Sequence, residues 1–199
     1  MVRLAATAKT FREIAAREIR WKPVDGVGLE HLSVRSDGGG TVACGVVVGQ
    51  RGGKPYGVRY SIVCDGSWHV LELHLDTTDG RAVNLSSDGS GNWADSTGRS
   101  IAQFSQCIDV DLAGTPFTNT LPIRRLNLNE ESGAVELKML YVPFDTFEPI
   151  VDFQRYRCLQ RGHVYRYEAV DRSFSADLPV DDDGIVLDYP TLFDRVSLE

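Results

Sequence analysis

The sequence contains no hydrophobic run that could cross a bilayer. Its longest apolar stretch, residues 42–49, has eight residues, whereas a transmembrane helix needs about 20. The chain also has no excess of positive charge, because 21 Lys and Arg face 28 Asp and Glu for a net charge of −7. An acidic chain repels phosphate backbones. We therefore expect neither a membrane span nor a nucleic-acid partner.

The motifs of metal centres, nucleotide sites and serine hydrolases are missing as well. The four histidines and four cysteines show no H-E-x-x-H spacing and no C-x-x-C pair, so we expect no metal site and no cofactor. The sequence has neither a G-x-S-x-G elbow nor a glycine-rich loop between a strand and a helix. We therefore assign no catalytic residue. We predict that the cysteines are reduced and mostly buried. They are Cys44, Cys64, Cys107 and Cys158.

The N-terminal segment predicts a short helix. Thr10 and Glu13 fit a capping box, and the apolar residues Phe11, Ile14 and Ile19 form a stripe behind it. The helix stands alone or leads into a strand at Ile19. No signal peptide is visible before it, so we expect a cytoplasmic protein.

Composition predicts one globular domain, because 42% of the residues are hydrophobic and 25% are charged. We place an N-terminal extension at 1–18 and a single β domain at 19–197. Residues 198–199 are interpreted as a cloning remnant. Nothing in the sequence predicts an oligomeric state.

Glycine-containing pairs mark regularly spaced turns. Asp37-Gly38, Gly52-Gly53, Asp65-Gly66 and Asp79-Gly80 follow one another at spacings of 15, 13 and 14 residues. Alternating runs rich in Val, Leu, Ile and Tyr lie between them, which is typical of consecutive antiparallel hairpins. We predict a mainly β fold: a strongly curved antiparallel meander, half-barrel or roll. Later strands are expected at 82–86, 108–112, 121–128, 135–142, 149–159, 164–169 and 185–189.

Turn length sets the expected register of each hairpin. A two-residue loop at Asp65-Gly66 would pair Tyr60 with Leu71 and place Arg59 opposite Glu72 as an ion pair. At Asp79-Gly80 the same loop would spoil the core face. A three-residue loop ending at Gly80 pairs Leu75 with Val83 instead, because that loop type needs glycine at its left-handed position.

Glu30 is expected on the apolar side of its strand. A loop at 36–40 would place Glu30 beside Val46. A buried carboxylate must have a hydrogen-bond donor or a cation as its partner, or else keep its proton. If Gly52-Gly53 is a two-residue turn, Val46 faces Arg59, and Glu30, Arg59 and Glu72 share one row. A loop of odd length would send Arg59 to the opposite face.

Two polar segments are candidates for chemistry. Asp109 and Asp111 alternate with apolar residues on one strand and are expected about 6.6 Å apart. Three interpretations are open: two solvated carboxylates, two ligand contacts, or a catalytic pair. Residues 115–126 contain two prolines and then, on an expected strand, Arg124 and Arg125 on opposite faces. An inward arginine needs acceptors, which Asp109, Asp111 or Glu30 could provide. The segment is a ligand site or a structural corner.

Several runs resemble a known family. They are Trp21, Asp25-Gly26-x-Gly28-Leu29-Glu30-His31-Leu32, Asp109-Val110-Asp111-Leu112 and the continuous run 115–126. These residues look like the bacterial family named putative glycolipid-binding proteins, and the likeness spans roughly residues 19–168. The resemblance implies a mainly β single domain with a cavity, similar to carriers of lipid or lipoprotein acyl chains, and no agreed catalytic residues. The segments before residue 19 and after Val170 look less typical.

We expect a non-enzymatic binding protein whose curved sheet cups a small amphiphilic or glycosidic ligand. Late aromatic residues between Tyr141 and Tyr167 line its pocket or belong to the core. The predicted polar contacts are Glu30, Arg59, Asp109, Asp111, Asn119, Arg124 and Arg125. One alternative is a hydrolase that acts on a glycoside or ester with Asp109 and Asp111, or Glu30, as acid and base. Another is an assembly module that associates through its sheet edges.

Overall fold

Two β-sheets form the protein, and the computed structural model describes residues 10–197 of the chain. The larger sheet has eight antiparallel strands in the order β13-β1-β2-β3-β4-β5-β6-β7. Its strands are β1 (Arg17–Pro23), β2 (Leu29–Asp37), β3 (Gly40–Arg51), β4 (Lys54–Cys64), β5 (Val70–Thr77), β6 (Ala82–Ser87), β7 (Trp93–Asp95) and β13 (Phe193–Arg195). From β1 to β7 each strand pairs with the next in the chain, which confirms the predicted meander for this sheet.

The smaller sheet has five strands in the order β12-β11-β10-β9-β8. Its strands are β8 (Asp109–Leu112), β9 (Ala134–Val142), β10 (Ile150–Gln160), β11 (Val164–Ala169) and β12 (Ser175–Pro179). β8 and β9 run parallel, which the antiparallel prediction did not allow. A parallel pair needs a crossover connection, and this one carries the 3-10 helix η2 (Pro116–Asn119) and the α-helix α1 (Thr120–Leu126).

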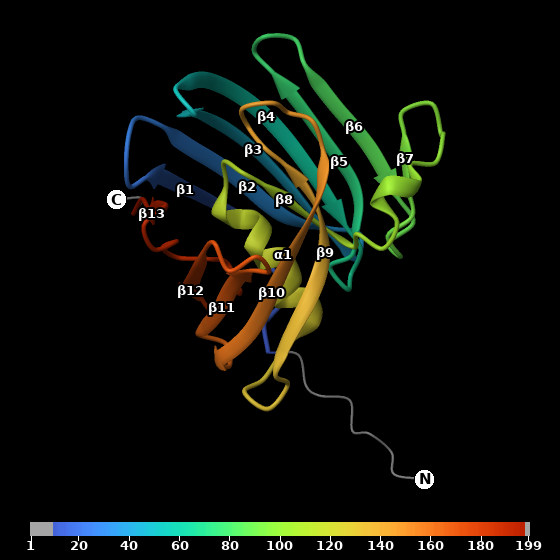
Figure 1. Cartoon of the computed structure of the whole chain (residues 1–199). Helices are drawn as coiled ribbons and strands as arrows, with labels where there is room; N and C mark the ends of the chain where they lie inside the picture. Colours follow the sequence, from blue (N-terminus) through green and yellow to red (C-terminus); the bar gives the residue numbers. More distant parts are fainter. Residues whose placement is uncertain (1–9, 198–199) are drawn as a thin grey trace.

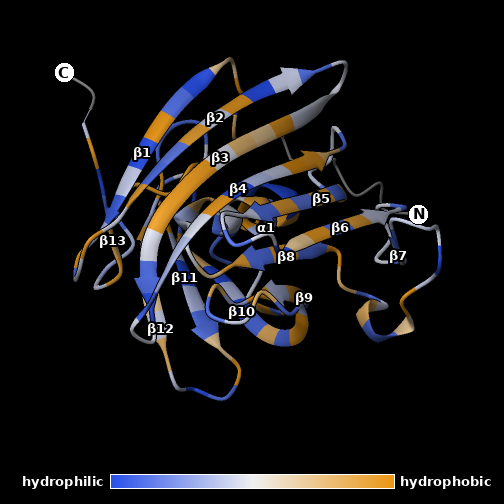
Figure 2. Cartoon of the chain, turned by 90° about the horizontal axis from the view of Figure 1, so that it is seen from above, coloured by the Kyte–Doolittle hydropathy of each residue, from blue (hydrophilic) through white to orange (hydrophobic). Residues whose placement is uncertain are grey.

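The hydrophobic core lies between the two sheets. The larger sheet arches behind the smaller one, and α1 lies between them (Figure 1). Inner side chains of the larger sheet, such as Ile62 and Leu73, pack in one cluster with Val110 and Leu140 of the smaller sheet. A second cluster joins α1 to β10, β11 and β12. Seen from above, hydrophobic and hydrophilic residues alternate along the strands of the larger sheet (Figure 2), as expected when one face is buried.

The predicted N-terminal helix is wrong for the described residues of that segment. Residues 10–16 form no helix, and β1 begins at Arg17; residues 1–9 lie outside the described part. Thr10 does not cap a helix, because its backbone N–H and its hydroxyl both donate to Asn127 Oδ1, at 3.1 and 2.7 Å. The apolar stripe is buried by tertiary packing instead, with Phe11 and Ile14 at 7% and 2% exposure.

The expected strand at 121–128 is helical. Pro122 lies in the first turn of α1, where proline removes no helical hydrogen bond, and the Thr115 hydroxyl accepts from Phe117 N at 3.0 Å to begin η2. The helix ends where Asn127 adopts a left-handed conformation with φ +47°. The expected strand at 185–189 is also wrong, because that segment has only two isolated bridges, one from Val186 to Val180 and one from Tyr189 to Phe193 of β13.

The register predictions have mixed outcomes. In the β5–β6 hairpin, Leu75 lies opposite Val83 and Gly80 has φ +89°, so the three-residue loop is confirmed. The β4–β5 hairpin differs by four residues, because Tyr60 pairs with Leu75 rather than Leu71. Its loop is wider than predicted: the Asp65 carboxylate accepts hydrogen bonds from two backbone N–H groups of the loop.

Glu30 faces inward as predicted, but the row that was to join it to Arg59 does not form. Gly38 and Gly39 make a two-residue turn, so Glu30 lies opposite Val47 instead of Val46. Gly52-Gly53 is a two-residue turn, and Val46 faces Arg59 as expected. Because of the one-residue difference at the first turn, Arg59 lies on the exposed outer face, on the opposite side of the sheet from Glu30. In the β4–β5 hairpin Arg59 lies opposite Asp76, so its predicted ion pair with Glu72 is wrong.

Within residues 10–197, no helix combines the length and the apolar character needed to span a membrane.

Candidate functional site

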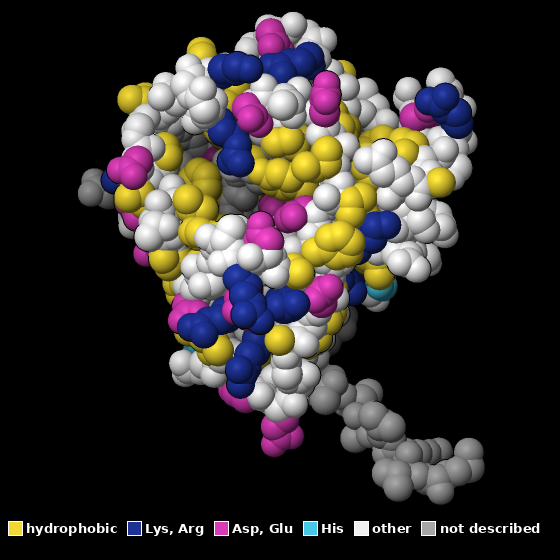
Figure 3. All heavy atoms as spheres, in the orientation of Figure 1, with side chains coloured by type: hydrophobic (Ala, Val, Ile, Leu, Met, Phe, Trp, Pro, Cys, Tyr) yellow, Lys and Arg dark blue, Asp and Glu magenta, His cyan; other side chains and the backbone are white. Residues whose placement is uncertain are grey.

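Two adjoining hollows open between the sheets. The tyrosine hollow, named for Tyr141, Tyr167 and Tyr189, has a volume of about 570 Å³. The valine hollow, named for Val27, Val47 and Val48, has a volume of about 430 Å³. Both are lined by Arg51, Ala113, Leu192 and Phe193, so they adjoin at these residues. Figure 3 shows this face hollowed near its centre, with acidic and basic side chains at the edge and apolar side chains around them.

Two carboxylates in the tyrosine hollow share one amide. The buried Gln154 donates through Nε2 to Asp111 Oδ2 at 2.7 Å and to Asp152 Oδ2 at 3.2 Å. The Thr118 hydroxyl also donates to Asp111, at 2.9 Å. Burial raises the pKa of Asp111, and the nearby Asp152 carboxylate acts in the same direction. Ionisation of the Asp111 carboxyl group is therefore unfavourable unless a bound ligand stabilises the negative charge.

Aromatic rings form one wall of the tyrosine hollow. The rings of Tyr167, Phe174 and Tyr189 lie 6.1 to 6.2 Å apart, centroid to centroid. Tyr167 and Tyr189 are only 9% and 7% exposed, and their hydroxyls have no hydrogen-bond partner among residues 10–197. This wall therefore offers both flat apolar surface and unused hydroxyl groups.

Arg51 and Asn119 complete the polar lining. Arg51 Nη2 donates to the Tyr141 hydroxyl at 3.0 Å, and its Nε lies 3.8 Å from Asp145. Asn119 accepts a 2.8 Å hydrogen bond from Tyr156. Arg51 lies at the end of β3, where the two hollows meet, and can reach a ligand in either one.

The valine hollow has one deeply buried acid. Glu30 is 2% exposed, and the Tyr60 hydroxyl donates to its Oε1 at 2.6 Å. Its other oxygen has no hydrogen-bond partner among the described residues. Burial raises the pKa of Glu30 to about 8, although the Tyr60 hydrogen bond acts in the opposite direction. Glu30 is therefore a neutral carboxyl group at pH 7.

The structure separates the predicted pair on β8. Asp111 lines the tyrosine hollow, whereas Asp109 is 1% exposed and forms an ion pair with Arg125 at 2.5 Å. The expectation that an inward arginine finds an acceptor at Asp109 is confirmed for Arg125. This pair borders a separate depression beside Lys138.

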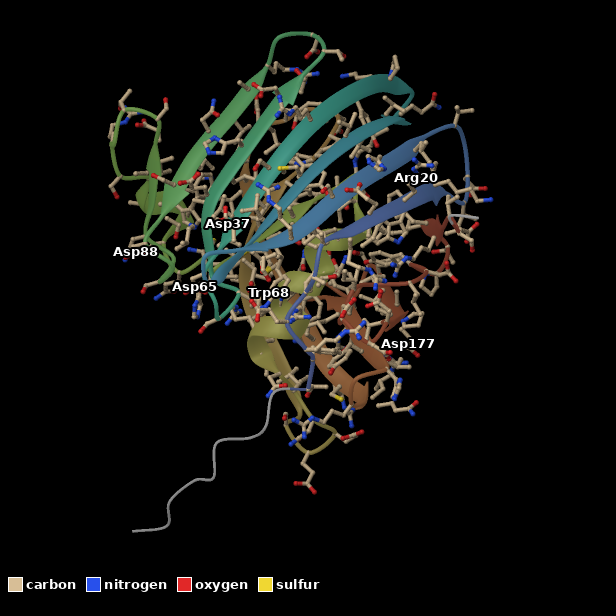
Figure 4. The ribbon with its side chains drawn as sticks, turned by 180° about the vertical axis from the view of Figure 1, so that it is seen from behind. Arg20, Asp37, Asp65, Trp68, Asp88 and Asp177 are labelled. Carbon is tan, nitrogen blue, oxygen red and sulfur yellow. The ribbon has the colours of Figure 1, made fainter. Side chains whose placement is uncertain are left out.

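Arg124 lies away from both hollows and holds loops together. Its guanidinium donates to the backbone oxygens of Arg12 and Asp183 and lies 4.3 Å from the Trp68 ring centroid. Trp68 is labelled beside α1 in Figure 4. Burial lowers the pKa of Arg124 to about 10. Of the predicted contacts, Glu30, Asp111 and Asn119 therefore line the joined hollows, and Arg59, Asp109, Arg124 and Arg125 do not.

Sequence reasoning missed Arg51, Asp152 and Gln154. Asp152 and Gln154 alternate on β10 with the apolar residues of an expected strand, so their spacing alone could have placed them on one face with Tyr156. Arg51 follows directly after an apolar run at a glycine turn, and nothing local marks it as a binding residue.

No cluster of three or more His, Cys, Asp or Glu side chains suited to a metal ion occurs within the described residues.

Comparisons with known proteins identify the family and a similar structure. A family model described as "Putative glycolipid-binding" matches residues 18–195, which includes the segment after Val170 that looked less typical. The chain is also similar to a crystal structure described as a DUF1089 family protein from Pseudomonas aeruginosa. The two share 31% sequence identity with a TM-score of 0.72, over 98% of this chain and 99% of that chain. No curated protein matches.

Proposed function

Because this chain belongs to the family described as "Putative glycolipid-binding", we propose that it binds one amphiphile, such as a glycolipid, across the joined hollows. The observation that carries the proposal is that the two hollows share the lining residues Arg51, Ala113, Leu192 and Phe193. Each hollow has a volume typical of small-molecule sites, which lie between about 300 and 1,000 Å³. A ligand with a polar part and an apolar part can therefore occupy both.

The polar head occupies the tyrosine hollow. Sugar hydroxyl groups are donors, and the carboxylates of Asp111 and Asp152 accept from them without donating in return. The rings of Tyr167 and Tyr189 give the flat face of a sugar an apolar surface to lie against. The free hydroxyls of these two tyrosines add donors for the ring oxygens of the ligand.

The hydrocarbon part occupies the valine hollow. Six of the eight large hydrophobic side chains that are exposed in the described structure line one of the two hollows. Val27, Leu29 and Val48 line the valine hollow, Leu192 lines both hollows, and Ile150 and Phe153 line the tyrosine hollow. Exposed apolar surface gathered at one place is typical of binding sites, and covering it gains about 25 cal/mol per Å².

Leu192→Trp tests the site at the junction. Leu192 is 40% exposed and lines both hollows, so a larger ring there fills the passage with little effect on the core. We expect dodecyl maltoside to bind the wild-type protein in a calorimetric titration and to bind Leu192→Trp at least about tenfold more weakly. Native mass spectrometry of the purified protein should show a retained lipid that the variant lacks.

Val46→Trp is the matched control. Val46 is also exposed, at 52%, but it lies on the outer face opposite Arg59. Equal binding by the wild type and Leu192→Trp would contradict the proposal, as would the absence of any binding of maltoside or retained lipid.

A glycoside hydrolase is the second candidate. Asp111 and Asp152 are joined by one amide, and burial raises the pKa of Asp111, which is the property required of a general acid. Chromogenic alkyl glycosides that are cleaved by the wild type and not by Asp111→Asn would favour this function. Binding without turnover favours the carrier.

A further inference from the structure

The tyrosine hollow has an unbalanced negative charge. Three aspartates line it, Asp111, Asp152 and Asp171, against one cation, Arg51. Arg51 already lies 3.8 Å from Asp145, an acid outside this lining. Within residues 10–197, neither Asp111 nor Asp152 has a Lys or Arg at ion-pair distance, and their hydrogen-bond donors there are the neutral groups of Gln154 and Thr118. A cleft lined by charge of one sign concentrates ions of the other sign.

The aromatic wall suits the same kind of ion. A ring face attracts a cation within about 6 Å of its centroid, most strongly where water is excluded. Tyr167, Phe174 and Tyr189 form a triangle of rings, and two of them are more than nine-tenths buried. Asp111 and the three rings line the same hollow, so the rings and the carboxylate surround the same space.

We propose that the head group bound in the tyrosine hollow carries a positive charge, as an amino sugar or another organic ammonium group does. This inference rests on the proposed amphiphile-binding function and narrows its ligand class. The ammonium group lies between the carboxylates of Asp111 and Asp152 and against the rings of Tyr167 and Tyr189. The hydrocarbon part still extends past Arg51 into the valine hollow.

Other head groups fit the charge balance less well. An anionic sugar or phosphate would meet the carboxylates at short range and would find only Arg51 to oppose them. A neutral sugar can donate hydrogen bonds to the two carboxylates, but it leaves them without a counter-charge. A cation balances the charge of the carboxylates and is also attracted by the ring faces.

Three octyl glycosides that differ at one position provide the test. The probes are octyl glucoside, its 2-amino-2-deoxy analogue and the N-acetylated form of that amine, each titrated calorimetrically at about pH 6, where the amine is protonated. We expect the amine to bind at least about fivefold more tightly than both neutral probes. High salt should reduce this preference, because salt screens charges that remain partly exposed.

Asp152→Asn and Asp111→Asn should each weaken binding of the amine by more than they weaken binding of octyl glucoside, and so reduce the preference for the amine. If Asp111→Asn does not fold, Asp152→Asn and the salt series still decide the question. Glu131→Gln, which removes an equal charge from an exposed loop outside both hollows, should keep the full preference.

The outcomes separate the two proposals. Equal binding of all three probes overturns the cationic head group and leaves the amphiphile site intact. Tighter binding of a neutral probe does the same. If none of the three binds, the proposed function itself fails.

Discussion

Buried acidic side chains in this protein are stabilised in different ways by their immediate surroundings. Asp109 is matched by the guanidinium of Arg125 at 2.5 Å. Asp111 has only neutral donors, and Glu30 has a single donor, Tyr60. A matched charge stays ionised, while an unmatched one keeps its proton or waits for a ligand. The first acid is therefore structural, and the other two are available for binding.

Glu30 should make stability depend on pH. Its pKa in the folded protein, about 8, lies above the ordinary value of 4.5, so the folded state binds the proton more tightly between these values. The free energy of unfolding therefore falls as the pH rises through this window, by at most about 1.4 kcal/mol per pH unit. Glu30→Gln cannot ionise and should lack this slope. Urea denaturation of both proteins from about pH 5 to about pH 8 measures the difference.

Because Asp111 is present in both proteins, its own titration cancels in that difference. Parallel stability curves for the wild type and Glu30→Gln would show that Glu30 is ionised in the folded protein.

Removing Arg125 should destabilise the protein strongly. Arg125→Met leaves the Asp109 carboxylate buried without its partner, which typically costs about 3–5 kcal/mol. The double variant Asp109→Asn with Arg125→Met should recover a large part of that loss, because no buried charge remains. Urea denaturation measures the free energy of unfolding of both variants. Equal stability of Arg125→Met and the wild type would mean that water reaches Asp109.

At the level of the strands, Gly45 makes room for the side chain of Tyr60 from the neighbouring strand. A Cβ at Gly45 on β3 would overlap the Tyr60 ring on β4. The ring therefore lies over the β3 backbone, and from there its hydroxyl reaches Glu30 on β2. The absence of a side chain at Gly45 thus lets Tyr60 on β4 reach across β3 to Glu30 on β2, the buried acid of the valine hollow.

Gly45→Ala should cost about 1–3 kcal/mol, because it forces the buried Tyr60 ring to move. The same substitution in a Tyr60→Leu background should cost much less, since the side chain that it meets is gone. A double-mutant cycle by urea denaturation measures this coupling. Additive effects of the two substitutions would contradict the close approach.

The segment 115–126 shows the limit of local patterns. Pro122 lies in a segment that was expected to be a strand, and proline is also compatible with the first turn of a helix. Arg124 and Arg125 in the last turn, followed by Asn127, are signals of a helix end that could have been recognised. Because the segment is a helix, these two arginines do not point to opposite sides of a sheet, and one reaches Asp109 while the other reaches the N-terminal loop.

As a whole, the molecule is held together by two apolar clusters that bury most of its thiols. Cys64 and Cys107 belong to the cluster between the sheets, and Cys158 belongs to the cluster behind α1. Cys44 is half-buried. Burial raises the pKa of the Cys64 thiol, which slows its reaction further.

A thiol reagent should therefore report the opening of the whole molecule. We expect at most Cys44 to react with a chromogenic disulfide within seconds at neutral pH. The other three cysteines should react at the rate of global unfolding, and all four should react in urea. Absorbance of the released thiolate measures the number and the rates. Fast reaction of a second thiol in the native protein would show that one cluster opens by itself.

Short-range rules were sufficient for part of this protein. Alternation of polar and apolar residues and the glycine turns predicted strands β2 to β6 of the larger sheet, the inward position of Glu30 and the loop at Gly80. These features depend on backbone sterics and on a period of two residues, which act over a few neighbours. Register was less certain, because one extra residue in a turn moves every following side chain to the other face.

The joined hollows could not be derived in the same way. Arg51, Asp111, Asp152 and Leu192 come from distant parts of the chain, and they meet because two sheets pack around a common core. Which faces pack together depends on the total apolar area buried and on the crossover through α1, and no local pattern contains that information. Sequence therefore identified most of the strands and several of the acids, and packing selected the acids that line the hollows.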